Sequence, residues 1–148
     1  MKSNSVIRVK RFNFIWVLLC LLLLLVACGK ASPPLDLRKN KARVAEGARL
    51  FAANCASCHG AEGQGHAQWR IKKADGNFHP PPLNGSGHTW HHKQEWLIAF
   101  VKNGSPVGTM PAWKDKLTLH QIESILAWAQ SRWPEWAYKR WLDVNEGN

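Results

Sequence analysis

Two cysteines and a histidine lie within five consecutive positions of the chain, at Cys55, Cys58 and His59. Two residues separate the thiols, and the histidine directly follows the second thiol. This spacing is the pattern of covalent haem attachment. Each thiol can add to one vinyl group of the porphyrin, and the adjacent imidazole can coordinate the iron. The sequence therefore predicts one covalently bound haem c, with His59 as an axial ligand of its iron.

Two other kinds of site use the same residue types. A zinc site needs a second pair of Cys or His ligands at similar spacing, and no cysteine follows Cys58. A dithiol redox site needs no histidine directly after its second cysteine, and it lies after a strand where a helix begins. Haem attachment is the interpretation that uses all three residues.

A six-coordinate iron needs a second axial ligand from a distant part of the chain. Met110 is the only methionine other than Met1, and it lies in a loop bounded by glycine and proline. Thioether ligation raises the reduction potential relative to ligation by two histidines. One alternative is that Met110 is a flexible core side chain. Another is that a histidine takes its place, with His88, His91 and His92 as the main competitors. We predict Met110 as the distal ligand.

The first 27 residues combine a basic start with a long apolar run, as secretory signal peptides do. The run is short for a transmembrane helix, which needs about 20 apolar residues. Its end, Leu25-Val26-Ala27-Cys28, resembles the lipobox of bacterial lipoproteins. We therefore predict a signal peptide at 1–27, cleavage before Cys28 and a lipid on that cysteine; the alternative is an uncleaved N-terminal anchor. Both place the rest of the chain on the bacterial periplasmic side, held at the membrane.

Charge restricts the partners. From Cys28 onward the chain has 16 Lys and Arg against 10 Asp and Glu, a net charge of about +6. A basic surface favours encounter with an acidic docking face of a redox partner or with anionic headgroups; a generally solubilising surface is equally compatible with this charge. Nucleic acid is not an expected partner of an exported lipoprotein.

The rest of the chain divides into three parts. Residues 28–40 contain Ser32-Pro33-Pro34 and predict a flexible tether. Residues 41–134 predict a helical domain, and residues 135–148 predict an aromatic C-terminal extension with a short helix. The tryptophans of this extension cover either the apolar surface of the domain or that of a partner.

Three helices are expected within the domain. The first begins near Lys41 and leads into the haem motif, and its apolar face contains Val44, Ala48, Phe51 and Ala52. The second spans about 93–103 and ends at Gly104. The last begins at a capping box formed by Thr118 and Gln121 and ends before Pro134.

Residues 41–134 resemble class I c-type cytochromes, particularly the bacterial single-haem domains of the cbb3-type cytochrome c group. Besides the haem motif, the resemblance is carried by the following residues: Gly47, Phe51, Pro81-Pro82-Leu83, Thr109-Met110-Pro111 and Trp128. It implies an all-α fold, a small cytochrome c fold of three to five helices wrapped around one covalently bound haem.

The same resemblance implies specific contacts. The first and last helices should cross, with Gly47 at the contact and Phe51 near Trp128. The carbonyl of Pro81 should accept the Nδ1 proton of the proximal histidine, and Leu83 should pack on the haem.

An iron with both axial positions filled exchanges electrons but does not readily activate oxygen or peroxide. We therefore predict an outer-sphere one-electron carrier in a respiratory or periplasmic chain, and not an enzyme. One alternative is a cytochrome subunit of a larger dehydrogenase or oxidase complex, and another is a haem peroxidase or ligand sensor. His88 and His92, four residues apart, could bind a second metal, contact a haem propionate or lie at the surface.

Overall fold

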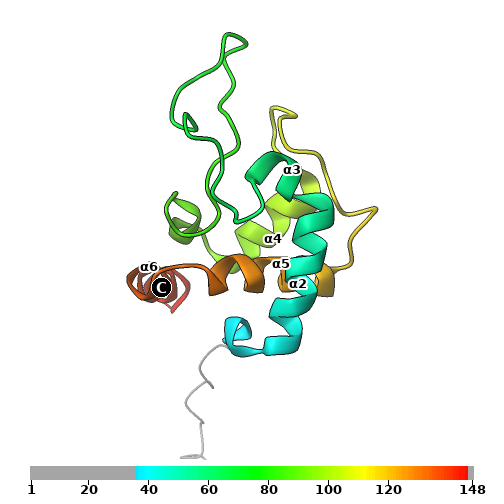
Figure 1. The fold of residues 1–148 in the computed structure, drawn as a ribbon, viewed down its shortest axis with the longest axis vertical. Helices are drawn as coiled ribbons and strands as arrows, with labels where there is room; N and C mark the ends of the chain where they lie inside the picture. Colours follow the sequence, from blue (N-terminus) through cyan, green and yellow to red (C-terminus); the bar gives the residue numbers. More distant parts are fainter. Residues whose placement is uncertain (1–35, 147–148) are drawn as a thin grey trace, which may run out of the picture. The chain divides into compact units, whose positions relative to one another are not determined.

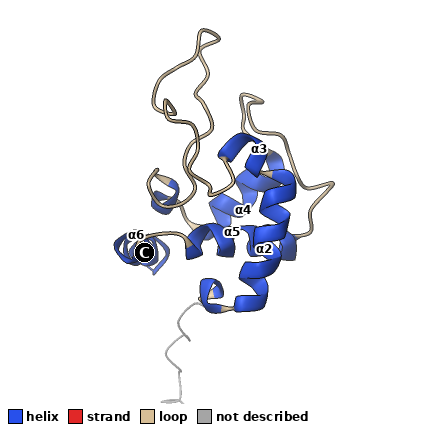
Figure 2. Ribbon diagram, viewed as in Figure 1, coloured by secondary structure: helices blue, strands red, loops and turns tan. Residues whose placement is uncertain are grey.

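The computed structural model describes residues 36–146, and these form a helical unit (Figure 2). The predicted signal peptide and Cys28 lie outside the described residues. The elements are, in order, η1 (Leu37–Lys39), α2 (Lys41–Asn54), α3 (Ala56–His59), η2 (Thr89–His91), α4 (Gln94–Asn103), α5 (Leu119–Ser131) and α6 (Glu135–Glu146). An isolated bridge between Lys72 and Phe78 is the only β pairing in this part of the chain. The predicted all-α class is confirmed.

Helices α2 and α5 cross at the centre of the unit (Figure 1). A Cβ atom on Gly47 would collide with the backbone oxygen of Ser124, so only glycine allows the two helices to come this close. Four residues on, the rings of Phe51 and Trp128 lie 4.1 Å apart between centroids, with their planes tilted by 34°. The predicted crossing and the predicted aromatic contact are both confirmed.

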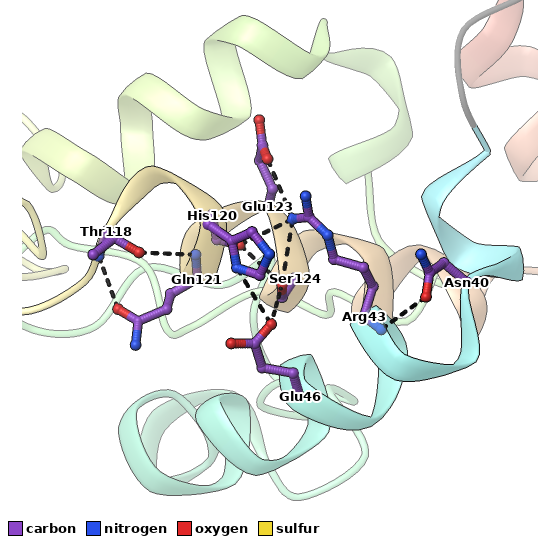
Figure 3. Close-up of polar contacts among 8 residues, drawn as sticks. All are labelled: Asn40, Arg43, Glu46, Thr118, His120, Gln121, Glu123 and Ser124. Carbon is purple, nitrogen blue, oxygen red and sulfur yellow. Dashed lines mark hydrogen bonds and ion pairs between the residues drawn. The ribbon is translucent and has the colours of Figure 1, made fainter.

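Polar side chains connect the same two helices at their edge (Figure 3). The Oε2 atom of Glu46 accepts a hydrogen bond of 2.8 Å from Ser124 Oγ and lies 3.4 Å from His120 Nδ1. Arg43 pairs with Glu123 at 3.3 Å. Because Ser124 is fully buried, its hydroxyl needs these partners. The crossing thus combines close backbone packing with satisfied polar groups.

The helix boundaries follow local sequence signals. Asn40 caps α2 by accepting a hydrogen bond from Arg43 N, and Thr118 forms the predicted capping box with Gln121 at the start of α5 (Figure 3). Helix α4 ends at Gly104, whose φ is 76°. These signals act within one turn, which is why the sequence alone predicts them.

One predicted core position is wrong. Ala52 is exposed, whereas Val44 and Ala48 are half-buried. The buried face of α2 is centred on Gly47 and Phe51, and a helix advances about 100° per residue, which places Ala52 about 120° from that centre.

The apolar side chains form two clusters. The first lies between α2, α4 and α5, and its buried members are Phe51, Leu97, Leu117, Ile122, Ile125, Leu126, Trp128 and Ala129. The second consists of Trp133, Ala137, Tyr138 and Trp141, with Trp90 and Leu142 packed against it. The C-terminal extension therefore covers apolar surface of its own domain, although Trp136 is 55% exposed.

Residues 36–40, the end of the predicted tether, belong to the folded unit instead. The guanidinium of Arg38 lies over the Tyr138 ring, 3.3 Å from its centroid. The same group donates hydrogen bonds to Asp36 and Glu135 at 3.0 and 3.1 Å. These contacts connect the start of the folded unit to α6, and the sequence pattern gave no sign of them.

The segment between α3 and η2 is a long loop (Figure 2). Its prolines, Pro80 to Pro82, remove successive backbone donors and exclude helix, as predicted.

Within the described residues, no helix has the length and apolar character needed to cross a membrane.

Candidate functional site

The two cysteines lie where α2 passes into α3. Cys55 ends α2 and precedes α3, and its carbonyl accepts hydrogen bonds from the backbone nitrogens of Cys58 and His59 at 3.1 and 2.9 Å. Both thiols are free; Cys55 is half-buried and Cys58 is exposed. Burial, with a smaller contribution from Cys58, raises the pKa of the Cys55 thiol to about 11. Cys55 is therefore a protonated thiol at neutral pH.

His59 is buried and has a defined tautomer. Its Nδ1 atom lies 2.9 Å from the carbonyl oxygen of Pro81, so Nδ1 carries the proton and donates it. Burial lowers the pKa of His59, against the opposing effect of this hydrogen bond. A neutral imidazole with its proton on Nδ1 has a free lone pair on Nε2, the atom that can bind a metal. The hydrogen bond expected from the resemblance is thus present.

Backbone hydrogen bonds fix the Pro81 carbonyl. The nitrogen of Leu83 donates to the oxygen of Gly63 at 2.7 Å, and the nitrogen of Gly65 donates to the oxygen of His59 at 2.7 Å. Gly65 has a φ of 66°, and a Cβ there would lie 2.6 Å from the carbonyl carbon of Pro81. The loop after His59 therefore packs its backbone directly on the proline segment.

A more distant residue reaches the same segment. Trp133 Nε1 donates a hydrogen bond of 2.8 Å to the oxygen of Leu83. Leu83 itself is half-buried against the first apolar cluster, as Cys55 is. Sequence reasoning did not identify Trp133 as a site residue, because no local pattern pairs two residues 50 positions apart.

Met110 lies on a separate loop after α4. Its backbone nitrogen donates a hydrogen bond to Ser105 Oγ at 3.0 Å, and its oxygen accepts one from Ser105 N at 3.0 Å. A Cβ on Gly104 would lie 2.6 Å from this oxygen. The Met110 backbone is thus fixed and its side chain half-buried, and ligation of iron by Met110 stays a prediction.

The predicted histidine cluster does not converge on one point. The ring of His91 lies 3.7 Å from that of Trp90, and the ring of His92 stacks on Trp96 at 4.0 Å between centroids. In residues 36–146, no group of three or more His, Cys, Asp or Glu side chains is arranged to hold a metal ion. The structure gives no support to a second metal at these histidines.

His88 instead lines a pocket of about 270 Å³ beside the proline segment. The other lining residues are Trp69, Arg70, Phe78, His79 and Pro81. The Arg70 guanidinium lies 4.6 Å from the centroid of the Trp69 ring. A guanidinium and imidazoles on an aromatic wall suit a carboxylate group. From the sequence, contact with a haem propionate is one of the options for His88, and the other lining residues are not identified.

The residues present fit a covalently bound haem. Cys55, directly before the short helix α3, and Cys58 within it present two free thiols, and His59 next to them is a neutral imidazole with an available Nε2. Apolar side chains of the first cluster pack against Cys55 and Leu83. This apolar surface can cover a porphyrin. This donor set is the one that c-type haem requires.

Comparisons with known proteins agree with this chemistry. The family model "Cytochrome C oxidase, cbb3-type, subunit III" matches residues 42–128, more than half of the chain. The chain is 41% identical over 83 residues to cytochrome c6 of Nostoc sp. (strain PCC 7120), covering 55% of this chain and 64% of that protein.

Two longer relatives are matched only in part. Thiosulfate dehydrogenase of Stutzerimonas stutzeri is 33% identical over 84 residues, 54% of this chain and 25% of that protein. Cbb3-type cytochrome c oxidase subunit CcoP of Azospirillum sp. is 32% identical over 89 residues, 60% of this chain and 28% of that protein. The chain thus spans less than two thirds of the length of these three relatives. No solved structure matches the chain.

The matched region contains nearly all of α2, the two cysteines, His59, Met110 and most of α5. The fold, the donor set and the family match point to the same conclusion. The chain belongs to the family of cytochrome c oxidase, cbb3-type, subunit III, and is a single-haem class I c-type cytochrome that binds haem c covalently.

Proposed function

We propose that this protein is a one-electron carrier whose haem is held by Cys55 and Cys58 through thioether bonds and by His59 and Met110 as axial ligands. When bound, haem supplies the Fe(III)/Fe(II) couple. The observation that carries the proposal is the 2.9 Å hydrogen bond from His59 Nδ1 to Pro81 O, directly after two free thiols. It fixes the tautomer that leaves Nε2 for iron.

Each remaining residue has a defined task. His59 retains its proton on Nδ1, and the bond to Pro81 orients the ring. Met110 provides a thioether from a loop whose backbone is fixed by Ser105. Leu83 would pack on the porphyrin, and the pocket lined by Arg70 and His88 would hold its carboxylate groups. With His59 and Met110 both bound to iron, no coordination position would be left for a substrate, so we propose a carrier and not an enzyme.

The test uses the complete protein purified from a host that attaches haem to c-type cytochromes. We expect the denatured protein to keep its haem through acid extraction and to have the mass of the polypeptide plus one haem. We expect the oxidised protein to show the near-infrared thioether-to-iron band. Release of haem would contradict attachment to Cys55 and Cys58, and avid binding of carbon monoxide by the reduced wild type would favour a peroxidase or sensor.

We also propose that the carrier works at the membrane on the periplasmic side, anchored by a lipid on Cys28. The support is the lipobox-like end of the segment 1–27. A Cys28→Ser variant should lose the lipid mass and either stay unprocessed or become soluble in the periplasm. A wild type that retains residues 1–27 would replace the lipid anchor by an uncleaved one. The partner proposed for the basic domain is a redox protein with an acidic docking face.

A second candidate is a cytochrome subunit within a larger complex. The partial match to the oxidase subunit CcoP favours it, as do the exposed aromatic side chains of Trp96 and Trp136, 45% and 55% exposed. Capture of the protein from native membranes separates the two candidates, since a subunit brings stoichiometric partners with it. A dehydrogenase activity like that of the thiosulfate dehydrogenase relative is tested by adding thiosulfate to the oxidised protein. A protein that is only an electron carrier does not oxidise thiosulfate.

A further inference from the structure

Trp133 connects the end of the chain to the proximal side of the site. It lies outside the region that matches the family, residues 42–128. Trp133 is 6% exposed, and its Nε1 donates a hydrogen bond of 2.8 Å to the carbonyl of Leu83. Leu83 follows Pro81 by two residues, and the Pro81 carbonyl accepts the Nδ1 proton of His59.

The segment 80–84 is held on one side by the loop that follows His59. The nitrogen of His66 donates to Pro80 O at 3.0 Å, and that of Leu83 donates to Gly63 O at 2.7 Å. These bonds come from the loop that directly follows His59, so they fix the proline segment relative to the histidine.

The other side of this segment is held by Trp133 and its neighbour. A Cβ on Gly85 would lie 2.7 Å from Pro134 Cδ and 3.1 Å from Trp133 Cα, so the two backbones are in close contact. Among the described residues, the Leu83 carbonyl accepts its hydrogen bond from Trp133 Nε1. Without that donor, a carbonyl next to the proline segment would lose its partner.

Trp133 is in turn held by α6. Its ring meets that of Trp141 edge-on, with centroids 6.2 Å apart and planes at 74°. Tyr138 lies in the same cluster and carries the Arg38 guanidinium on its face. The indole donor therefore has a fixed position, and this position depends on the C-terminal extension.

We infer that Trp133 is a positioning residue for the proximal histidine, acting through Leu83 and Pro81. The inference rests on the proposed function, in which His59 coordinates the haem iron. A strong hydrogen bond from Nδ1 to Pro81 makes Nε2 more basic and stabilises Fe(III). Loss of the Trp133 donor releases Leu83, lengthens the bond between His59 and Pro81, and raises the reduction potential.

The test compares Trp133→Phe with the matched control Trp136→Phe, both in the complete haem-loaded protein. Trp133→Phe keeps an aromatic ring but removes the donor, whereas Trp136 is exposed. We expect Trp133→Phe to raise the reduction potential and to speed solvent exchange of the His59 Nδ1 proton, measured by NMR, while the haem mass and the thioether band stay unchanged. We expect Trp136→Phe to change none of these.

A second variant separates hydrogen bonding from packing. Site-specific replacement of Trp133 by 3-benzothienylalanine keeps the bicyclic shape and puts sulfur in place of the N–H group. The same rise in potential is expected from it, even if Trp133→Phe does not fold. A wild-type potential and wild-type proton exchange in the benzothienyl protein would overturn the inference, whatever its thermal stability. Absence of covalent haem in the wild type would instead overturn the proposed function, and this inference with it.

Discussion

The two sides of the proposed haem site are built differently. On the proximal side, His59 is bonded to Pro81, and residues from two other parts of the chain hold the segment 80–84, namely the loop 60–66 and Trp133. On the distal side, the backbone hydrogen bonds of Met110 within residues 36–146 are all with Ser105, five residues earlier, and its oxygen also packs against Gly104. In the distal loop, residues 106–109 are all exposed, with Val107 70% exposed.

The difference determines how each side can move. A segment bonded to distant parts of the chain moves only when those parts move with it, so its opening approaches global unfolding. A loop closed on itself can open locally at low cost. The proximal ligand should therefore share the stability of the fold, whereas the distal ligand should dissociate from iron without unfolding the protein.

The strongest test of this comparison uses one glycine from each side. Gly65 and Gly108 have φ values of 66° and 74°, so alanine is strained at both. Only Gly65 is also packed on backbone, since a Cβ there would collide with Pro82 N, whereas nothing lies within 4 Å of a Cβ on Gly108. We expect Gly65→Ala to lower the free energy of unfolding by about 4 kcal/mol or to prevent folding, and Gly108→Ala to lower it by about 1–2 kcal/mol.

Denaturant unfolding of both haem-loaded variants, followed by circular dichroism, measures this difference. Equal losses of stability at Gly65 and Gly108 would show that the proximal loop is no more constrained than the distal one.

Removal of the distal ligand should change the iron much more than the fold. We expect Met110→Ala to lose the near-infrared thioether band, to lower the reduction potential and to bind carbon monoxide when reduced. Because the side chain is half-buried, the loss of unfolding free energy should be about 1–2 kcal/mol, below the 2–5 kcal/mol of a fully buried Met→Ala change. An unchanged spectrum and potential would show that Met110 does not bind the iron and would favour one of the histidines as the distal ligand.

The same contrast explains what the sequence could predict. The haem motif, the cap at Thr118 and the end of α4 at Gly104 are local, so residue type and spacing predicted them. The contact at Gly47 and the Pro81 hydrogen bond came from the family resemblance, which carries long-range pairings that spacing alone does not encode. Trp133 had neither kind of signal, since it lies beyond the matched region and its partner is 50 residues away.

A smaller effect is expected from the hydroxyl that fixes the Met110 loop. Ser105 Oγ accepts from Met110 N at 3.0 Å and lies 3.0 Å from Thr109 Oγ1. Ser105→Ala should cost about 1 kcal/mol of stability and should speed carbon monoxide binding to the reduced protein, because the loop opens more often. The control is Ser86→Ala, which removes a bond of 2.7 Å to Asn84 in an exposed turn near the proline segment. A comparable acceleration in Ser86→Ala would contradict local opening of the distal loop.

The smallest effect, confined to high pH, concerns the support that α6 gives to the proximal side. Burial, followed by the hydrogen bond to Asp36, raises the pKa of Tyr138 to about 12. The folded protein thus favours the neutral phenol, and this contribution to stability is complete below the ordinary tyrosine pKa of about 10. It is lost as pH rises through the folded value, because an ionised phenolate no longer suits the buried cluster.

The unfolding free energy of wild type and Tyr138→Phe is measured between about pH 8 and 12. The difference between them gives the contribution of Tyr138 ionisation, because lysine deprotonation is common to both proteins. The wild type should lose stability relative to the variant only above about pH 10. If Trp133 transmits the state of α6 to Pro81, the potential of the wild type should rise over the same range, beyond any change in the variant. A parallel pH dependence in the two proteins would show that Tyr138 stays protonated or that α6 does not bear on the proximal side. Because the Met110 backbone is held by its hydrogen bonds with Ser105, carbon monoxide binding should not distinguish the two proteins at any pH in this range.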